Sequence, residues 1–328
     1  MKAISYTRFG PASEVLELTD LPTPDPAPGE VLVRLTYSGA NPSDVKSRAG
    51  GRPGVTRLAF DRIVPHSDGA GEVVAVGQGV DPLRVGQPVW IWNGQWRRAL
   101  GTAAEYIALP AAQAVPRPDW IGAEAGATLG IPGLTAAHAV LGGGDVAGQT
   151  LLISGGGGAV GHNAVQLAAW AGARVIATCS PRDTDRVRAA GAAEVLDYRD
   201  PDLSGKLLDL TQGRGIDRVI ETEFGVNAAL LAEVMAENST IAAYGSALDM
   251  KPVLPFGPYL FKAITIDIVL IYLLGDAARV VAIDALHKAS AEGALRPAIH
   301  ATYPLADCVV AHECIEAGGR AGAVLLEM

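Results

Sequence analysis

A run of glycines between an apolar segment and a helix-forming segment is the feature of this sequence that most clearly points to chemistry. The stretch Thr150–Gly172 reads TLLISGGGGAVGHNAVQLAAWAG. Its glycines fit the spacing G-x-G-x-x-G, in which they turn the chain, let backbone approach a diphosphate and let a helix pack on a strand. The positive end of that helix would face the phosphates. The pattern predicts a dinucleotide site at Gly156, Gly157, Gly158, Ala159, Val160 and Gly161.

A glycine-rich surface loop would give the same motif, so the flanking sequence has to decide between the two interpretations. After the motif, strand-like segments alternate with helix-like segments of about ten residues. The strands are expected at 174–179, 194–197, 216–221 and 240–244, and the helices at 182–190, 203–212 and 226–236. This alternation predicts an α/β domain with a doubly wound parallel sheet, and the motif lies on its first strand-to-helix turn.

The bulk composition indicates two globular domains without a nucleic-acid surface. A chain of 328 residues is long for one core, and 49% hydrophobic with 19% charged residues is an ordinary globular composition. A net charge of −9 argues against a nucleic-acid partner, which would require a basic stripe. The three cysteines are odd in number and form no C-x-x-C, so a disulfide framework and a structural zinc site are both unsupported. A reducing cytoplasm fits this cysteine usage.

The longest apolar run, Ala263–Leu274, is too short to span a bilayer and contains Asp267. The first residues do not resemble a signal peptide, so we expect no membrane partner. The β-branched residues of the run predict a long strand at the end of the parallel sheet. Such a strand would pair two subunits into a homodimer through residues 263–272, although an internal strand without a partner chain remains open.

The N-terminal third has a different pattern, with short alternating strands separated by proline and glycine. These strands are expected at 2–6, 15–18, 30–40, 69–77, 87–92 and 103–109. Many short strands with turn signals predict a small β-barrel or sandwich. Residues 123–141 then predict two helices joined at Gly130–Gly133, which lead into the glycine-rich turn.

Several segments together carry a family resemblance that runs nearly end to end. They are PGEVLVRLTYSGANPSD, SDGAGEVVAVGQGV, GTAAEYIALP, GIPGLTAAHAVL, the glycine-rich turn, GIDRVIE and the closing YPLADCVVAHECIEAGGRAGAVLLEM. The chain resembles the medium-chain dehydrogenase/reductases, specifically the zinc-independent quinone oxidoreductase (zeta-crystallin-like) branch. This resemblance implies a GroES-like catalytic domain at 1–122, completed by 298–328, and an inserted Rossmann dinucleotide-binding domain at 123–297. It places the active site in the cleft between them.

The same resemblance implies that the chain holds no catalytic metal. Zinc-dependent relatives carry a cysteine and a histidine–glutamate pair at the positions that Asn41, Ser67 and Asp68 occupy here. A catalytic zinc ion needs about three nitrogen, sulfur or carboxylate ligands, and neither an amide nor a hydroxyl replaces a thiolate or imidazole. We expect His66, one place earlier, to be a hydrogen-bonded structural residue. His312 and Cys314 are two further candidate ligands. They lie in a helical segment whose family counterpart binds no metal.

The second strand of the parallel sheet indicates which nicotinamide cofactor is used. An acid at the end of this strand would accept hydrogen bonds from the ribose of NAD, but here the strand ends at Ser180 without one. Arg182 and Arg186 follow, and arginine suits the 2′-phosphate of NADPH. Asp183 could reach the ribose if the strand ended one residue later. The sequence therefore favours NADPH.

Further cofactor contacts are implied by the resemblance alone. They come after the third, fourth and fifth strands and from the apolar run, at Tyr198, Asn227, Gly245, Ser246, Val269 and Leu270. For Val269 and Leu270, packing in the core is an equally good interpretation.

Hydride transfer mainly requires orientation of the cofactor against an electrophilic carbon. Asn41 could donate to the carbonyl oxygen of a substrate, and Asp44 could orient water or Asn41, or cap backbone N–H groups in the turn. Tyr244, Trp92 and Asn93 would line the cleft, and the aromatic side chains would form a wall suited to a flat conjugated carbonyl compound. The role of Lys46 stays open.

These residues predict an NADPH-dependent enzyme that reduces quinones without a metal. Reduction of 2-alkenals, enones or enoyl thioesters would use the same hydride delivery, and the sequence does not separate these substrates. A non-catalytic NADPH-binding protein is a third possibility, which the retention of Asn41, Asp44 and an intact glycine-rich turn disfavours.

Overall fold

The computed structural model describes residues 1–51 and 54–328, and backbone contacts divide the chain into two compact units. The first unit comprises Met1–Ile131 and Pro297–Met328, and the second comprises Pro132–Arg296. The division falls later than the boundary expected after residue 122, because helix α3 (Ala123–Gly126) packs on strands of the first unit. A Cβ atom added to Gly126 would lie 3.4 Å from the side chains of both Ala70 and Trp90.

The first unit contains a seven-stranded sheet with the order β14-β15-β3-β4-β5-β7, with β6 paired to β3, and a two-stranded sheet of β1 and β2. Its strands are β1 Lys2–Ser5, β2 Glu17–Asp20, β3 Glu30–Ala40, β4 Asp68–Val76, β5 Pro88–Ile91, β6 Tyr106–Pro110, β7 Ala114–Pro116, β14 Ile299–Pro304 and β15 Ala323–Glu327. Its other helical elements are α1 Ala12–Val15, α2 Pro42–Arg48, η1 Pro82–Arg84, η2 Ala111–Gln113, η6 Leu305–Asp307 and α11 Cys308–Ala317.

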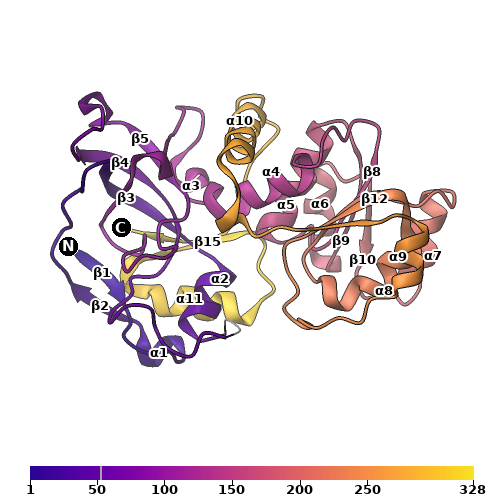
Figure 1. Ribbon diagram of the computed structural model, residues 1–328, viewed down its shortest axis with the longest axis horizontal. Coiled ribbons are helices and arrows are strands. Elements are labelled where there is room, and N and C mark those ends of the chain that lie inside the picture. The colour runs from indigo at the N-terminus through magenta and orange to yellow at the C-terminus, as the bar shows by residue number, and fades with distance from the viewer. Residues whose placement is uncertain (52–53) are drawn as a thin grey trace. The chain divides into compact units, whose positions relative to one another are not determined.

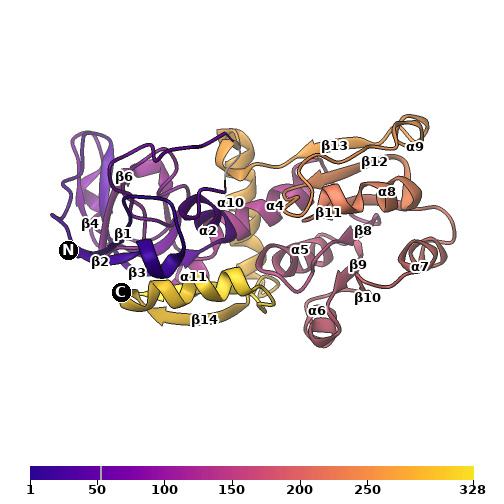
Figure 2. The same cartoon turned by 90° about the horizontal axis from the view of Figure 1, so that it is seen from below.

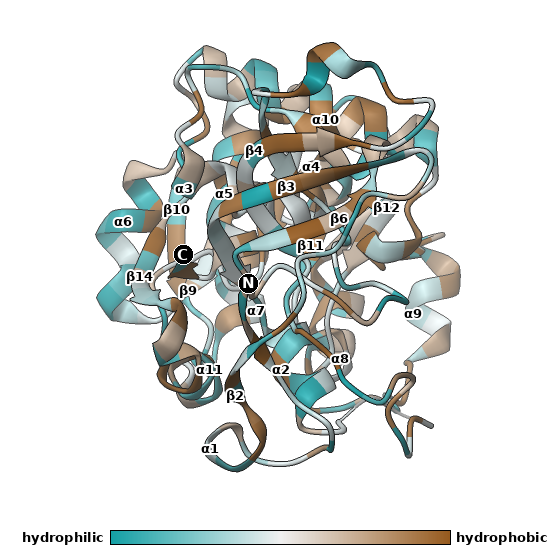
Figure 3. Cartoon of the chain, turned by 90° about the vertical axis from the view of Figure 1, so that its left-hand side faces the viewer, coloured by the Kyte–Doolittle hydropathy of each residue, from teal (hydrophilic) through white to brown (hydrophobic). Residues whose placement is uncertain are grey.

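The C-terminal segment completes the sheet of the first unit. Strand β15 pairs antiparallel with the long strand β3, and β14 pairs parallel with β15. One hydrophobic cluster lies between the sheet strands, and the hydrophobic colouring of β3, β4 and β6 is visible in Figure 3. A second cluster joins α11 and β15 to the N-terminal strand β1. The two ends of the chain therefore share one core, as a GroES-like domain completed by the last residues requires.

The second unit contains a six-stranded parallel sheet with the order β10-β9-β8-β11-β12-β13. Its strands are β8 Thr150–Ile153, β9 Arg174–Cys179, β10 Glu194–Asp197, β11 Ile216–Glu221, β12 Met235–Ala243 and β13 Thr265–Ile268. Its helical elements are α4 Leu134–Leu141, α5 Ala159–Trp170, η4 Pro181–Asp183, α6 Thr184–Ala189, α7 Leu203–Leu210, α8 Phe224–Val234, α9 Phe256–Phe261, η5 Ile271–Leu273 and α10 Asp276–Ala291.

This sheet confirms the predicted doubly wound fold. The strand order reverses between β8 and β11, which is the arrangement of dinucleotide-binding sheets. Helices cover both faces: α5 and α6 lie on one side, and α7 and α8 on the other (Figure 2). Leucines of α7 and α8 pack with Leu152, Ile176 and Val219 of the strands in one hydrophobic cluster. The glycine-rich turn thus lies at the carboxyl end of the first strand of the sheet.

Two local predictions were wrong. The run 263–274 contains only the short strand β13, because the chain leaves the sheet after Ile268 and forms the turn η5. Residues 15–18 are divided between the end of helix α1 and the start of β2. The two helices expected in 123–141 are α3 and α4, and the segment that joins them forms a π-helical turn at Leu129–Gly133. Within residues 1–51 and 54–328, no helix combines the length and apolar character needed to cross a membrane.

Strand β15 is a sensitive point of the first unit, because its side chains pack between the N-terminal and C-terminal parts of the chain. Leu325 is completely buried. We expect Leu325→Ala to lower the free energy of unfolding by about 2–5 kcal/mol, since it leaves a cavity in the core. Urea unfolding followed by tryptophan fluorescence measures this change, because Trp90, Trp92, Trp96 and Trp120 all belong to this unit.

Leu83→Ala is the matched control, because Leu83 is 88% exposed and its truncation should leave the unfolding midpoint within experimental error. Equal destabilisation by the two substitutions would contradict a structural role for β15 in this core.

Candidate active site

The glycine-rich turn joins β8 to α5 in the second unit (Figure 1). Gly155 adopts a φ of 70°, and a Cβ atom on Gly161 would lie only 2.1 Å from the carbonyl oxygen of Gly155. A side chain at either position would therefore open the turn. Gly158 is the N-cap residue of α5, and an added Cβ there meets only the Gly155 oxygen, at 3.5 Å. The first N–H groups of α5 have no partner within the helix, so the turn offers donors and free space together.

Arg186 and Asp183, which follow strand β9, contact the backbone of the glycine-rich turn. The guanidinium of Arg186 donates to the carbonyl oxygen of Gly157 at 2.5 Å and to the Asp183 carboxylate at 3.1 Å. Asp183 is 7% exposed, and a Cβ atom on Gly157 would lie 2.8 Å from its carboxylate oxygen. Gly157 therefore has to be glycine because Asp183 lies against it. The sequence suggested none of these contacts, because it offered Asp183 only as a possible ribose ligand.

The residues predicted to bind the 2′-phosphate differ in their burial and in the contacts that they make within the protein. Arg186 is partly buried in the contacts above, whereas the Arg182 side chain is 57% exposed and its Nε lies 3.4 Å from Asp183. Ser180 is half-buried at the end of β9, where its carbonyl oxygen accepts the N–H of Asp183. Tyr198, after β10, is 55% exposed with the Arg199 guanidinium over its ring. Arg182 is thus the arginine more available to a phosphate, and Arg186 acts mainly on the turn.

Glu221 is a buried carboxylate that the sequence did not single out. It ends β11, beside the end of β8, and accepts hydrogen bonds from the Ser154 hydroxyl at 2.8 Å and the Asn227 amide at 3.0 Å. The backbone N–H of Glu223 donates to it as well. Burial raises the pKa of Glu221 above its ordinary value of 4.5, although these donors act in the opposite direction. Asn227, a predicted cofactor contact, is therefore engaged in holding the ends of β8 and β11 together.

The predicted nicotinamide contacts lie at the ends of β12 and β13. Tyr244 is half-buried, its N–H donates to the Glu221 carbonyl oxygen, and burial raises the pKa of its phenol. A Cβ atom on Gly245 would lie 2.3 Å from the Thr222 carbonyl oxygen. The Ser246 hydroxyl accepts the Gly225 N–H at 2.8 Å.

Two further predicted contacts follow β13. Val269 is buried and donates its N–H to the Ala243 carbonyl oxygen at 2.9 Å, whereas Leu270 is 48% exposed. The Val269 side chain thus packs in the core, whereas Leu270 presents apolar surface.

In the first unit, Asn41 and Asp44 lie at the start of helix α2. The Asp44 carboxylate accepts the Asn41 backbone N–H at 2.8 Å, which is the capping role considered from the sequence. The Asn41 side-chain amide donates to Asp68 at 2.8 Å, and both residues are almost fully buried. Burial raises the pKa of Asp68 well above its ordinary range, while Asn41 and the Ile131 amide lower it. At the positions where zinc-dependent relatives carry ligands, the chain thus has an amide bonded to a carboxyl group.

The remaining residues proposed for the substrate side occupy different environments. Asn93 is buried, Trp92 is half-buried, and Lys46 is exposed on α2. His66 is hydrogen-bonded, as expected, to Ser38 and to His312.

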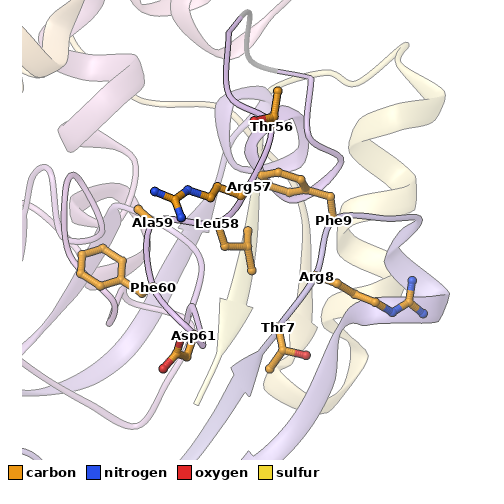
Figure 4. A pocket seen from close by; sticks show the side chains of 9 residues that line it. All are labelled: Thr7, Arg8, Phe9, Thr56, Arg57, Leu58, Ala59, Phe60 and Asp61. Atoms are coloured by element: carbon orange, nitrogen blue, oxygen red, sulfur yellow. The ribbon is translucent and has the colours of Figure 1, made fainter.

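A separate surface pocket of about 660 Å³ is lined by Thr7–Phe9 and Thr56–Asp61 (Figure 4). It contains none of the predicted site residues, so its size alone does not make it the active site.

Two family models match the chain. The alcohol dehydrogenase GroES-like domain matches residues 27–119, and the zinc-binding dehydrogenase model matches residues 159–287. The chloroplast envelope quinone oxidoreductase homolog of Arabidopsis thaliana is 34% identical over 77% of this chain and 75% of its own length. The quinone oxidoreductase of Sus scrofa is 30% identical over 99% of this chain and 97% of its own. The chain belongs to the medium-chain dehydrogenase/reductase superfamily. Its branch within that superfamily is the quinone oxidoreductase branch.

Solved structures agree with this family assignment. A mycobacterial protein complexed with NADPH has a TM-score of 0.89 and 28% identity, with both chains covered completely. The quinone oxidoreductase of Pseudomonas syringae has a TM-score of 0.87 and 28% identity, covering 100% of this chain and 99% of that one. This member of the superfamily is accordingly an oxidoreductase enzyme with a GroES-like domain and a Rossmann-like domain.

Glu221 makes the stability of this enzyme depend on pH in a defined direction. Because its pKa is higher in the folded state, the folded chain binds more protons than the unfolded chain above pH 4.5, and stability falls as the pH rises through the folded-state value. Glu221→Gln keeps the shape and removes this titration. We therefore expect the free energy of unfolding of the wild type to fall relative to that of the variant as the pH rises over this range. Urea unfolding at several pH values measures both free energies.

Asp119→Asn is a control of the same chemistry on a carboxylate outside this network. A pH-independent difference between wild type and Glu221→Gln would show that Glu221 does not titrate as the burial implies.

Proposed function

We propose that this enzyme uses NADPH to reduce quinones by direct hydride transfer, without a catalytic metal ion. The names of the relatives support the quinone class, and the NADPH complex of a protein with the same fold supports the cofactor. The observation that carries the metal-free part is the hydrogen bond between Asn41 and Asp68. The Asn41 amide is neither a thiolate nor an imidazole, so Asn41, Ser67 and Asp68 do not form the ligand set of a catalytic zinc ion.

The second unit fits a bound dinucleotide at the glycine-rich turn. Main-chain N–H groups at the start of α5 would hold the diphosphate, and the space beside Gly158 lets it approach the backbone. Arg182 would pair with the 2′-phosphate, while Arg186 fixes the turn through Gly157. The ends of β12 and β13 would position the nicotinamide through Tyr244, Gly245, Ser246, Val269 and Leu270. When bound, the cofactor supplies a hydride.

The first unit would orient the substrate. The Asn41 amide has two N–H groups, and Asp68 takes one of them at 2.8 Å. The Asn41 Nδ2 atom also lies 3.5 Å from the Gly39 carbonyl oxygen, which is a weak contact. The second N–H can therefore donate to a quinone carbonyl oxygen as negative charge develops on it. Asp68 acts as a positioning residue, because its hydrogen bond fixes the orientation of the amide.

A parallel assay of substrates tests the proposed reaction. Loss of NADPH absorbance should be fast with quinones and slower with 2-alkenals, enones and enoyl thioesters. A preference for one of these other classes would replace quinones as the substrate, and silence with all of them would leave a binding protein. Asn41→Ala should lower kcat by roughly tenfold or more, because a transition-state donor is lost.

Gly158→Ala tests the cofactor site separately. The added methyl group fits the free turn, where the nearest atom is 3.5 Å away, but it enters the space proposed for the diphosphate. We expect the Kd for NADPH to rise more than tenfold, with little change in thermal stability, as measured by NADPH fluorescence titration. Gly257→Ala, whose added methyl group meets no atom within 4 Å, is the control. Unchanged affinity in Gly158→Ala would contradict this binding mode.

We also propose that the enzyme is a cytoplasmic homodimer that pairs through β13 and the residues that follow it, with no nucleic-acid or membrane partner. The strand lies at the edge of the parallel sheet, and apolar side chains around it are exposed. Ile268 is 69% exposed, Phe256 70% and Leu273 61%. An unpaired sheet edge with a large apolar patch is typical of a subunit contact.

Ile268→Asp should convert this dimer to a monomer, because it places a charge at the centre of the contact. Light scattering after size-exclusion chromatography measures the mass. Leu83→Asp, at an exposed residue of the first unit, should leave the dimer intact. A monomeric wild type, or a dimeric Ile268→Asp variant, would contradict pairing through β13.

A further inference from the structure

Three side chains able to bind a metal ion converge inside the first unit, and none of them occupies a position where zinc-dependent relatives carry a ligand. His66, Cys308 and His312 each offer one ligand atom, and these atoms all lie within 4.8 Å of one another. All three residues are completely buried. Cys308 begins helix α11 and His312 follows one turn later, so both side chains leave the same face of the helix toward His66.

A chain of hydrogen bonds fixes the proton of His66. The Thr102 hydroxyl donates to the Asp68 carbonyl oxygen at 2.5 Å, so in its 2.8 Å contact with Ser38 it has to accept. Ser38 then uses its proton on Thr102, and in its 3.0 Å contact with His66 the donor is Nδ1–H. Nε2 of His66 therefore carries a lone pair directed at α11. This arrangement, with one ring nitrogen donating and a lone pair on the other, is typical of histidines that bind metals.

His312 faces this lone pair. Its Nε2 lies 2.9 Å from Nε2 of His66, and the rings are nearly parallel, with centroids 5.1 Å apart. Its other nitrogen, Nδ1, is buried and has no hydrogen-bond partner among residues 1–51 and 54–328. Coordination through Nε2 would not engage this nitrogen, so the convergence of the three ligand atoms is the feature that points to a metal ion.

The backbone at His66 is held in an unusual conformation that directs its ring toward α11. His66 has a φ of 75°, in the left-handed region that non-glycine residues seldom adopt. Hydrogen bonds from Thr102 to the His66 carbonyl oxygen and from Ala103 to the Pro65 carbonyl oxygen keep it there. Such local strain persists only where the surroundings over-determine it, and it gathers at ligand sites.

We propose that His66, Cys308 and His312 bind one transition-metal ion, with Zn²⁺ as the expected occupant, at a structural site separate from the reductase centre. A sulfur and two imidazole nitrogens form a ligand set that selects zinc or similar ions over Mg²⁺ and Ca²⁺. Zinc–nitrogen bonds of about 2.0–2.1 Å in a tetrahedral shell would bring the two Nε2 atoms to roughly 3.3 Å, a small opening from the contact in the free pair. A water molecule would complete the shell.

Binding replaces the Cys308 S–H bond by a sulfur–zinc bond and releases that proton to solvent, with no change in oxidation state. The two imidazoles bind as neutral lone-pair donors. The Arg48 guanidinium acts electrostatically on His312, but it is paired with Glu316, which limits its repulsion of the ion. The ion would fasten α11 to the segment before β4, and so the C-terminal part of the sheet to the N-terminal part.

Cobalt spectroscopy tests the site on the intact wild-type chain. After treatment with chelator and addition of Co²⁺, a thiolate-to-cobalt charge-transfer band should appear with about one ion per chain, and Zn²⁺ should remove it. Zn²⁺ should also raise the Tm of wild type. A wild type that stays folded but shows neither the band nor the shift in Tm would overturn the proposal.

Matched variants locate the ligands. Cys308→Ser and His312→Gln should lose the band, whereas Cys314→Ser, on the same helix but only half-buried, should keep it. Ser38→Ala should keep the fold and weaken Zn²⁺ binding by about 10–100-fold, because it removes the partner that orients His66. Circular dichroism and NADPH titration show that each variant is folded. A band that survives in Cys308→Ser but disappears in Cys314→Ser would place the metal elsewhere and contradict the site.

Discussion

The close approach of Gly161 to the Gly155 carbonyl oxygen is the constraint on which the second unit depends. This contact brings the start of α5 against the end of β8, so the free N–H groups of the helix point over the edge of the sheet. The turn cannot keep this shape alone, because its glycines have many other conformations available. Arg186 and Asp183 supply the restraint from η4 and α6. A binding loop without side chains is thus ordered by charged residues about thirty positions later in the sequence.

The first unit has a different constraint, because it buries polar groups in its core. An amide and a carboxyl group in an apolar core are costly unless each has a partner. The Asn41 amide donates to one oxygen of the Asp68 carboxyl group, and Asp44 caps the helix that begins beside them. A Cβ atom on Gly130 would lie 2.2 Å from Asp68, so this glycine allows the carboxyl group its position. The pair is therefore ready to orient a substrate carbonyl group.

The sequence predicted what depends on local pattern and missed what depends on distant contacts. The strand–turn–helix at Thr150–Gly172 was recognisable because glycine spacing and apolar periodicity lie within one short stretch. The apolar run at 263–274 was wrong as a long strand, because its length in the sheet is set by the partner β12 and not by its own composition. Glu221 carried no sequence signal, and Asp183 was considered only as a ribose ligand, because the contacts of both residues come from burial beside distant segments. Cys314 drew attention, whereas the fold brings Cys308 to the histidines.

The segment from His66 to Asp68 connects the proposed metal site with the proposed substrate site. His66 turns toward α11, whereas Asp68, which begins β4, faces Asn41. The Asp68 carbonyl oxygen also accepts the last hydrogen bond in the chain that starts at His66 and passes through Ser38 and Thr102. An ion bound on one side of this segment would restrict the backbone that presents the carboxyl group on the other. A metal ion at the proposed structural site would thereby stabilise the proposed substrate site, because His66 and Asp68 are separated by one residue at the start of β4.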